Sequence, residues 1–346
     1  MTRKMTRTGD MDDKNKTTTL KDIASEAGIS TTAVSKVLNN KGGVSKETEA
    51  RVLEIASRLD YRPNYVAKSL KTRSTKTLGL VVSDSSHSFF GSMIKGAEAE
   101  AARRGYNIIL ANTNRSRETE RDAINTLIGK RIDGLLLAAS MLTGAEDRAY
   151  LDSLGVPYVF VVRKSENQSA PFVGNDNVRG ACEIVEYMIK TGSRRIHFLN
   201  MNETSTSSKD RLRGYRQALE ASGISFDNGL VYNMRPEIED GRSVMRGILE
   251  RDKNVHAVFC GCDILGIGAM EAIFEAGLRV PEDVRVCGYD DIEFAAYLRR
   301  PLTTMRQPKE VIGAKAVELI LARLENKNDY PDAVVLKSEL VVRQST

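Results

Sequence analysis

The chain has 346 residues, of which 41% are hydrophobic and 28% are charged, and this length and composition predict a globular protein of about two domains. This composition excludes disordered and fibrous proteins. A disulfide scaffold is excluded as well, because the 4 cysteines are too few and too clustered for a disulfide framework. The polar N-terminus has no apolar signal segment, and no apolar run reaches the ~18 residues that span a bilayer. We therefore expect a cytoplasmic protein with reduced thiols and no membrane partner.

The positive charge is concentrated at the N-terminal end. The formal net charge is +5, and residues 1–75 hold 15 Lys and Arg against 9 Asp and Glu, so the rest of the chain is close to neutral. A basic head on a neutral body favours a polyanion as the partner of the head. A solvated basic surface would give the same count.

Residues 1–18 show no periodicity and are expected to form a flexible tail, whereas a regular helical pattern begins at Thr19. Thr19 can cap a first helix together with Asp22. Gly28 suits the turn that follows because glycine tolerates a positive φ, and Ser30 can cap a second helix. A third helix with an inward apolar stripe follows Ser45. The caps, the turn glycine and the small residues predict an all-α helix-turn-helix domain over residues 19–62.

The outer side of the second helix carries short hydroxyls and an amine, which suit the edges of major-groove bases and nearby phosphates. The alternative is a helix cap with solvated polar neighbours, above all for Ser35. The residues of the head expected to contact DNA are Thr19, Ser30, Thr31, Thr32, Ser35, Lys36, Asn39 and Tyr61.

The run TLKDIASEAGISTTAVSKVLN resembles the start of bacterial transcription regulators of the LacI/GalR family, and the resemblance extends from about Thr19 to the end of the chain. The segment YRPNYVAKSLKTRST is similar to the family's hinge, which implies that residues 63–76 form a short helix in the minor groove. By that resemblance Leu70 is a wedge between base pairs. The hinge residues implied to meet DNA are Asn64, Ala67, Lys68, Leu70 and Lys71. Without the resemblance, a basic linker would be the simpler interpretation.

From Leu78 onward, short buried strands alternate with amphipathic helices, which predicts doubly wound parallel sheets. The strands are too many for one sheet, so we expect an α/β core of two lobes over residues 77–346. The resemblance implies a periplasmic-binding-protein-like core, with lobe one at about 77–163 plus 293–325 and lobe two at about 164–292 plus 326–346. The strands are expected at 78–84, 106–112, 134–140, 158–162, 196–200, 256–261 and 284–290, and helices at 91–104, 117–129, 178–191, 210–221, 241–251 and 264–277.

Ligands of open parallel sheets bind beyond the carboxyl ends of the strands, and the resemblance implies an effector cleft there. Packing under a loop is the alternative for the aromatic residues, and an inter-lobe salt bridge is the alternative for the charged ones. The weaker candidates Asp84, His87 and Asp176 lie on neighbouring loops, and His87 is expected to be an exposed loop histidine. The residues implied to contact the effector are Phe89, Phe90, Arg163, Arg211, Cys262 and Asp290.

The chain departs from its sugar-binding relatives at two places in this cleft. Cys262 stands where such proteins often have Asn, and Val162 stands where they often have Asp. Two arginines against one aspartate would suit an anionic ligand such as a sugar acid or a sugar phosphate, so both neutral and acidic sugars remain candidates.

The sequence predicts a regulator rather than an enzyme, with no cofactor and no metal. The stretch GIGAME lacks the third glycine of a dinucleotide fingerprint, there is no phosphate loop, and the three histidines are far apart. A solute-binding transport protein is the rival, which the helix-turn-helix disfavours. We expect an effector-controlled repressor of a near-palindromic operator, bound at the nucleoid. Activation, and a corepressor in place of an inducer, stay open. A homodimer is expected, because little chain follows the last strand.

Overall fold

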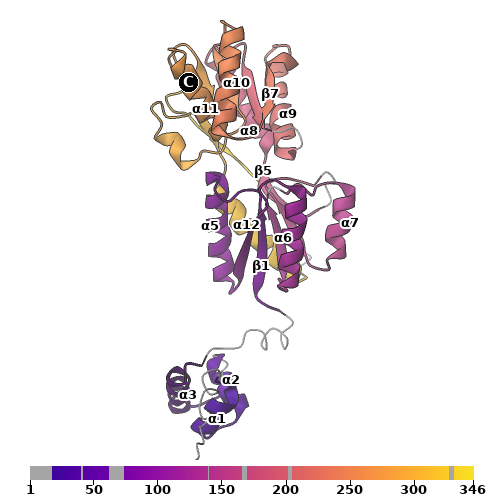
Figure 1. Cartoon of the computed structure of the whole chain (residues 1–346), viewed down its shortest axis with the longest axis vertical. Helices are drawn as coiled ribbons and strands as arrows, with labels where there is room; N and C mark the ends of the chain where they lie inside the picture. Colours follow the sequence, from indigo (N-terminus) through magenta and orange to yellow (C-terminus); the bar gives the residue numbers. More distant parts are fainter. Residues whose placement is uncertain are drawn as a thin grey trace, which may run out of the picture. The chain divides into compact units, whose positions relative to one another are not determined.

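The computed structural model describes residues 18–39, 42–61, 74–138, 140–165, 170–201, 205–326 and 331–346. The chain forms two compact units, Met1–Arg73 and Ser74–Thr346, which we call the head and the core (Figure 1). The tail 1–17 and the predicted hinge residues Asn64, Ala67, Lys68, Leu70 and Lys71 lie outside the described residues. No helix in the described ranges combines the length and hydrophobicity that crossing a bilayer requires.

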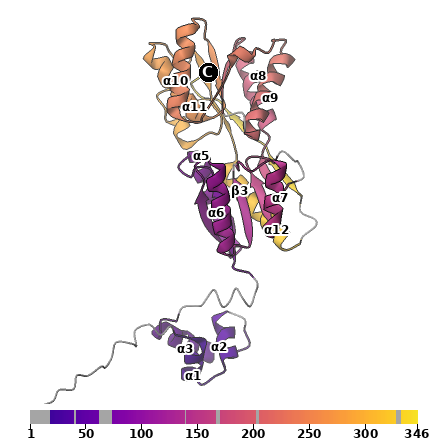
Figure 2. The ribbon, with the colours of Figure 1, turned by 45° about the vertical axis from the view of Figure 1, so that its right-hand side comes forward.

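The head consists of α1 (Leu20–Ala27), α2 (Thr31–Leu38) and α3 (Lys46–Arg58), labelled in Figure 2. The predicted caps are present: the Asp22 carboxylate accepts hydrogen bonds from the Thr19 N–H at 2.8 Å and the Thr19 hydroxyl at 2.7 Å. The Ser30 Oγ accepts one from the Ala33 N–H at 3.2 Å. Gly28 has a φ of 66°, as the turn requires. Apolar residues of all three helices meet in one small core.

Lobe one of the core is a parallel sheet of six strands in the order β11-β5-β4-β3-β1-β2. Helices α5 and α12 pack on one face, and α6 and α7 pack on the other. The strands are β1 (Thr77–Val82), β2 (Asn107–Asn112), β3 (Gly134–Ala138), β4 (Tyr158–Val161), β5 (Phe172–Asn175) and β11 (Ala333–Leu336). The helices are α5 (Ser88–Arg103), α6 (Arg117–Gly129), α7 (Ala145–Ser153) and α12 (Lys309–Leu324).

Lobe two is built around a parallel sheet of four strands in the order β7-β6-β8-β9. Helices α8 and α9 cover one face, and α10 and α11 cover the other. The strands are β6 (His197–Met201), β7 (Val231–Met234), β8 (Ala257–Cys260) and β9 (Arg285–Cys287), with 3-10 turns η1 (Asn228–Leu230) and η2 (Glu293–Ala296). The helices are α8 (Asn177–Lys190), α9 (Thr206–Ala221), α10 (Ile238–Arg251) and α11 (Asp263–Glu275). The antiparallel pair β10 (Thr304–Arg306) and β12 (Glu339–Val341) lies beside α8.

The predicted strands and helices are present with shifted ends, but the predicted lobe boundaries are wrong. β5 and β11 belong to the sheet of lobe one, whereas the prediction placed residues 164–175 and 326–336 in lobe two. Residues 293–306 pack on lobe two, because Ala295 and Leu302 belong to its core. The chain crosses between the lobes at 175–177, 306–309 and 336–339, and these short extended crossings carry no hydrophobic period that would mark them in the sequence.

Candidate DNA-contacting helix and effector cleft

The exposed face of α2 carries the side chains predicted to contact DNA. Val34 and Val37 are buried in the head, whereas Thr31, Thr32 and Lys36 on the opposite side are exposed. This division follows from the period of the helix, because residues three and four apart share a face. Two short hydroxyls and one amine are therefore presented side by side to solvent.

The other predicted residues of the head hold the helices in place. Ser30 caps α2, and Asn39 donates a hydrogen bond to the half-buried Ser35 carbonyl at 2.7 Å, closing the end of α2. Thr19 is exposed in the cap of α1. Tyr61 is partly buried against the core of the head. These residues therefore have a structural role that each of them can fulfil without DNA.

The six residues implied to contact the effector all line one cleft between the lobes, at the carboxyl ends of β1, β4, β6 and β8. Of the weaker candidates, His87 lies in the lining and Asp84 and Asp176 do not. This is the edge of the sheets at which ligands of such folds bind. The predicted residues in the lining are Phe89, Phe90, Arg163, Arg211, Cys262 and Asp290. The remaining lining residues are Ser83, His87, Arg115, Val162, Met201, Ser205, Ser207, Pro236 and Gln307.

Arg211 forms the centre of the lobe-two wall. Its side chain is buried, and its Nε donates a hydrogen bond to the Asn177 Oδ1 at 2.9 Å while Nη1 donates to the Gly261 carbonyl. The guanidinium stacks on the ring of Tyr289 at 3.8 Å from the centroid, and Nη2 lies 3.7 Å from the Asp290 Oδ1. Such a fixed guanidinium needs no reordering to meet a ligand oxygen.

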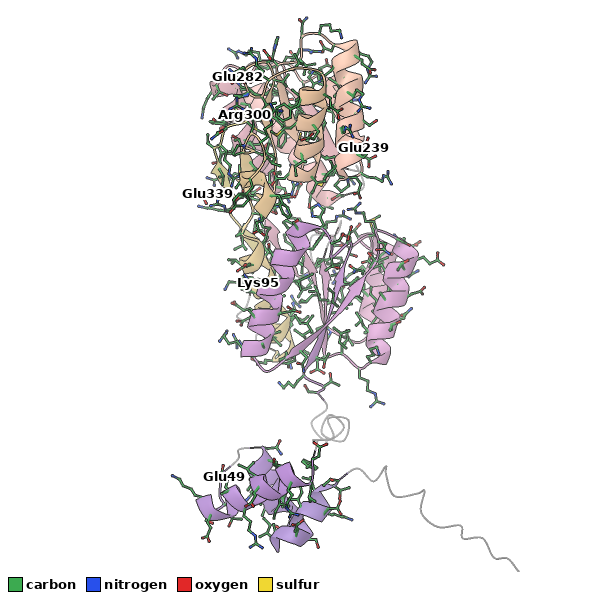
Figure 3. All side chains as sticks on the ribbon, turned by 60° about the vertical axis from the view of Figure 1, so that its left-hand side comes forward. Glu49, Lys95, Glu239, Glu282, Arg300 and Glu339 are labelled. Carbon is green, nitrogen blue, oxygen red and sulfur yellow. The ribbon has the colours of Figure 1, made fainter. Side chains whose placement is uncertain are left out.

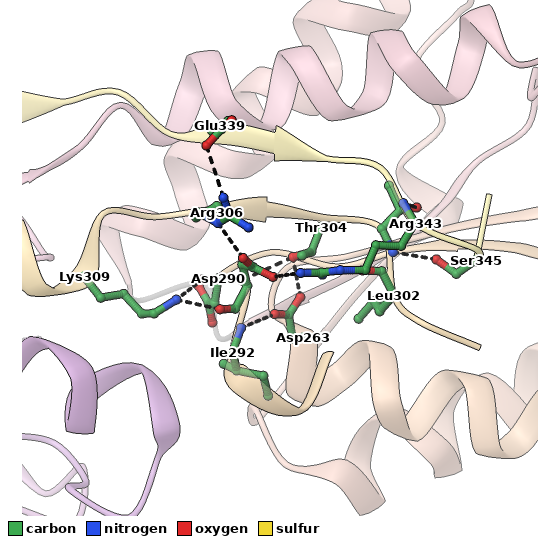
Figure 4. A network of polar contacts seen from close by, with 12 residues as sticks. Asp263, Asp290, Ile292, Leu302, Thr304, Arg306, Lys309, Glu339, Arg343 and Ser345 are labelled. Atoms are coloured by element: carbon green, nitrogen blue, oxygen red, sulfur yellow. Dashed lines mark hydrogen bonds and ion pairs between the residues drawn. The ribbon is translucent and has the colours of Figure 1, made fainter. Parts of the chain in front are cut away.

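Asp290 lies at the base of the cleft in a strained backbone conformation, with a φ of 116°. The Gln307 amide donates a hydrogen bond to its carboxylate at 2.5 Å. The Lys309 Nζ donates to the Asp290 carbonyl at 2.6 Å, as Figure 4 shows. Burial raises the pKa of Asp290 above its usual value, while Arg211 opposes that shift. The aspartate is therefore held in one geometry by residues from the crossing into α12.

A polar network behind Asp290 joins the crossings between the lobes (Figure 4). Asp291 accepts hydrogen bonds from the Arg306 Nε and the Arg343 Nη2, each at 2.6 Å. Burial alone would raise the pKa of Asp291, but these two guanidinium groups hold it below its usual value. Asn175 of the first crossing donates to the Tyr289 hydroxyl at 3.1 Å and to the Ser338 hydroxyl at 3.0 Å, so the first and third crossings are tied together.

The lobe-one wall contains a second arginine, the half-buried Arg163, which follows β4. Burial lowers its pKa to about 10, and the carboxylate of Glu120 opposes that shift. Glu120 is itself buried and accepts hydrogen bonds from the Ser140 hydroxyl and, at 2.8 Å, from the Met141 N–H. Glu120 could not be predicted as a neighbour of Arg163, because it lies in the first turn of α6, far along the chain from Arg163.

Arg115 bridges the two lobes at the cleft. Its Nη1 lies 2.6 Å from the Glu237 Oε1 in lobe two, and its Nη2 lies 3.8 Å from the Asp84 Oδ2 in lobe one. Arg115 follows β2 in a left-handed conformation, with a φ of 59°, which directs the chain around this corner. Arg115 was not among the residues predicted from the sequence. Its position just after the carboxyl end of β2 is the feature of the sequence that could have indicated a place at the cleft.

Three polar atoms of the cleft lining are buried and have no hydrogen-bond partner among the described residues: the His87 Nδ1, the Ser205 Oγ and the Gln307 Oε1. Such atoms are rare in folded proteins and cost free energy, unless water or a ligand pairs with them. His87 lies in the loop before α5, as expected, but it is half-buried with its Nδ1 covered, so the expectation that it is exposed is wrong. Ser205 and Gln307 were missed, because loops are generally rich in hydroxyl and amide side chains.

The apolar part of the cleft comes from the start of α5. Phe89 and Phe90 are 4% and 8% exposed, and their rings meet edge to face with centroids 5.3 Å apart. Both also belong to the core of lobe one, so the packing expected as an alternative role is present as well. Cys262 is buried, and burial raises the pKa of its thiol. In the described part of the chain, no cluster of His, Cys, Asp and Glu is arranged to hold a metal ion.

Comparison with known proteins decides the family. The chain is 35% identical over 327 residues to the HTH-type transcriptional repressor PurR of Pasteurella multocida, which covers 94% of this chain and 98% of the relative. It is also 35% identical over 328 residues to PurR of Vibrio atlanticus, with the same coverage. Residues 19–64 match the model of bacterial regulatory proteins of the lacI family. Residues 185–346 match the model of periplasmic binding protein-like domains.

The chain belongs to the LacI family. It is a DNA-binding transcriptional regulator with a helix-turn-helix head and a periplasmic-binding-protein-like core, and not an enzyme. Among solved LacI-family structures, the lac repressor dimer bound to operator and the anti-inducer ONPF has a TM-score of 0.87 at 25% identity, covering 95% of this chain and 99% of that one. The transcriptional regulator CelR–cellobiose complex has a TM-score of 0.73 at 32% identity, covering 95% and 100%.

Proposed function

We propose that this LacI-family regulator is a repressor that binds a near-palindromic operator at the nucleoid as a homodimer. A small molecule bound in the cleft between the lobes would control its affinity for the operator. The observation that carries the proposal is the exposed face of α2, on which Thr31, Thr32 and Lys36 stand free of the packing of the head. The related PurR proteins are named repressors, which supports the sign of the regulation.

In the proposed complex, α2 lies in the major groove. Thr31 and Thr32 contact base edges, and Lys36 contacts a phosphate or a base. The family resemblance adds that the hinge, with Leu70 as a wedge, enters the minor groove and bends the operator. Two heads on one duplex read two half-sites, so the operator repeats with the symmetry of the dimer.

Exposed apolar side chains on both lobes support the homodimer. Leu110 is 41% exposed on β2, the outer strand of the lobe-one sheet next to α5. In lobe two, Phe294 and Tyr297 are 60% and 81% exposed on and just after η2. Large apolar side chains exposed together mark contact surfaces, and the lac repressor structure that this chain resembles is a dimer. We therefore expect Tyr297→Asp to shift the chain toward monomer in sedimentation experiments.

The charges of the cleft favour a neutral effector. Each arginine in the lining interacts with a carboxylate: Arg115 with Glu237, Arg211 with Asp290, and Arg163 with Glu120. The arginines that favoured an acidic ligand are thus each accompanied by a carboxylate. The unpartnered His87, Ser205 and Gln307 atoms suit the hydroxyl groups of a sugar, and CelR was solved with cellobiose, a neutral sugar.

Selection of DNA by the purified full-length chain tests the proposed function. Genomic fragments retained at near-physiological salt are sequenced, and a chain carrying Thr31→Ala, Thr32→Ala and Lys36→Ala is the control. We expect the wild type to retain a few near-palindromic sites and the triple variant to lose them. Retention of the same fragments by both chains would refute the assignment of α2.

Calorimetry tests the proposed effector class. The full chain is titrated with neutral mono- and disaccharides and with the aldonic acids and phosphates of the same sugars. We expect binding of a neutral sugar, abolished by Arg211→Met. Binding of the acidic forms alone would show that the cleft prefers anions. Adding the bound sugar to the DNA selection then shows whether it releases the operator or strengthens its binding.

A further inference from the structure

The carboxylate of Asp133 holds the first residues of the core. Asp133 lies in the turn between α6 and β3, and its Oδ1 accepts hydrogen bonds from the Thr75 N–H at 2.8 Å and the Thr75 hydroxyl at 2.9 Å. Its Oδ2 accepts from the Lys76 N–H at 3.0 Å and from the Ser74 hydroxyl. One side chain thus binds three consecutive residues at the point where the core begins.

The backbone at this point adopts a conformation that the surroundings must enforce. Lys76 has a φ of 52°, in the left-handed region that non-glycine residues rarely adopt. The Lys76 Nζ lies 4.3 Å from the ring centroid of Tyr106 and 3.2 Å from its hydroxyl. Because Tyr106 directly precedes β2, this contact also fixes the side chain of Lys76 against the start of that strand. Strained residues persist where neighbouring contacts over-determine them, and they cluster at clamps and switches.

The residues held by Asp133 lead directly into β1, which ends at the effector cleft. β1 is paired along its length with β2 and β3, and Ser83, the residue after β1, lines the cleft. The Asp133 N–H also donates to the Thr77 carbonyl at 2.8 Å, which joins the anchor to the start of the strand. The anchor and the cleft therefore lie at the two ends of β1, an interior strand of the lobe-one sheet. This strand is labelled in Figure 1.

We infer that Asp133 is a positioning residue that couples the core to DNA binding: it fixes the place at which the chain coming from the head joins lobe one. This inference rests on the proposed function. With the anchor in place, a movement of lobe one at the cleft displaces the attachment of the head by a matching amount. Without it, residues 74–76 add to the linker, and about 10 Å of extra chain can absorb the movement. This extra length of chain exceeds the ~3.4 Å by which one base pair lengthens the DNA.

The consequence is that the anchor sets how strictly the dimer measures the distance between half-sites. The test uses the duplex selected by the wild-type full-length chain and the same duplex with one base pair inserted at its centre. We expect the wild type to prefer the selected duplex strongly, and Asp133→Ala to reduce that preference about fivefold or more by weakening binding to the selected duplex more than to the lengthened one.

Two further variants separate positioning from folding. Thr75→Val removes the hydroxyl that donates to Asp133 and, at 2.8 Å, to the Arg131 carbonyl, without touching the carboxylate. We expect Thr75→Val also to reduce the preference for the selected duplex over the lengthened one. This variant therefore tests the inference even if Asp133→Ala does not fold. The matched control is Asp152→Asn in α7 of the same lobe, where Asp152 accepts hydrogen bonds from Tyr158 and Arg148. We expect this control to keep the wild-type preference.

Hydrogen exchange gives a readout that needs no DNA. The Thr75 and Lys76 amides should exchange faster in Asp133→Ala, whereas the amides of β1 beyond Leu78 should keep their protection. A spacing preference that is unchanged in both Asp133→Ala and Thr75→Val would overturn the inference while leaving the proposed function standing. A wild-type chain that selects no duplex at all would overturn the proposed function and the inference with it.

Discussion

Lys36 is the exposed cation on the face of α2 that carries Thr31 and Thr32, and this position makes it separable from the sensing function. Lys36→Ala should lower operator affinity about tenfold and reduce the dependence of log Kd on log salt by about one, because one phosphate contact is lost. Fluorescence anisotropy across a salt series measures both quantities. Arg51→Ala, which removes an exposed cation from α3, is the control. Equal losses in the two variants would mean that Lys36 contributes only general charge.

Asp263, in the buried network behind the cleft, gives the core a pH dependence. It accepts hydrogen bonds from the Ile292 N–H at 2.8 Å and the Thr304 hydroxyl, and burial, with Asp290 nearby, raises its pKa well above the usual range. The folded state therefore holds a proton that the unfolded state releases. The contribution of this group to stability is full below about pH 4, where an unfolded aspartate is protonated, and is lost as the pH rises through the folded-state pKa.

Asp263→Asn should remove that pH dependence, because an amide can still accept from Ile292 and can donate to Thr304 without carrying charge. We expect the free energy of unfolding to fall less steeply with rising pH in the variant than in the wild type. Urea unfolding at several pH values between about 4.5 and 8 measures the difference. Parallel pH profiles for the two proteins would contradict the assignment.

At the scale of elements, α5 and α12 cross closely because each supplies a glycine. A Cβ added at Gly96 would lie 2.0 Å from the Glu310 carbonyl oxygen, and one added at Gly313 would lie 2.0 Å from the Met93 carbonyl oxygen. The two backbones thus touch where a larger residue would force them apart. Lys95 on α5 and Glu310 on α12 add an exposed ion pair at 3.0 Å beside the contact, and Lys95 is labelled in Figure 3.

Gly96→Ala should therefore destabilise the core by about 1–3 kcal/mol or more, as overpacking does elsewhere. Gly91→Ala in the same helix has no atom within 4 Å of the added Cβ and should be neutral or stabilising by up to ~1 kcal/mol, since alanine favours a helix over glycine. Chemical unfolding of both variants separates the crowding of the interface from the helix propensity. A loss of equal size at both positions would show that the close crossing is not what constrains Gly96.

The helices and strands also show which parts of the fold could be predicted from the sequence. Periodicity predicted the helices of the head, their caps at Thr19, Ser30 and Ser45, and the strand-and-helix alternation of the core, because these are local features. The family resemblance placed Arg211 and Asp290, which lie together in the cleft. The division into lobes failed because β5 and β11 pair across a long stretch of chain, and nothing local marks that pairing. Glu120 was missed because its contact with the Ser140–Met141 loop likewise joins residues far apart in the chain.

At the scale of the whole molecule, the contact between Arg115 and Glu237 links the lobes at the cleft. Glu237→Gln should raise the Kd of the effector about two- to fivefold, a small effect because both side chains are partly exposed to water. It should also make that Kd less sensitive to salt. Calorimetry with whichever sugar binds in the proposed titrations measures both quantities.

The neighbouring Glu239 provides a matched control for this prediction. It is labelled on α10 in Figure 3 and pairs at 3.3 Å with Arg242 of the same helix, so its ion pair stays within lobe two. Glu239→Gln should leave effector binding unchanged. An equal effect of both substitutions would mean that net charge, and not the bridge between the lobes, sets the affinity.

The place of β11 in the lobe-one sheet has a consequence for synthesis of the protein. The head is completed by contacts within residues 18–61, so its fold is available soon after it leaves the ribosome. The sheet of lobe one lacks its edge strand β11, and α5 lacks α12, until almost the entire chain has been made. The nascent chain therefore carries a finished DNA-binding domain ahead of an unfinished sensor, whose exposed apolar faces are covered only at the end of translation.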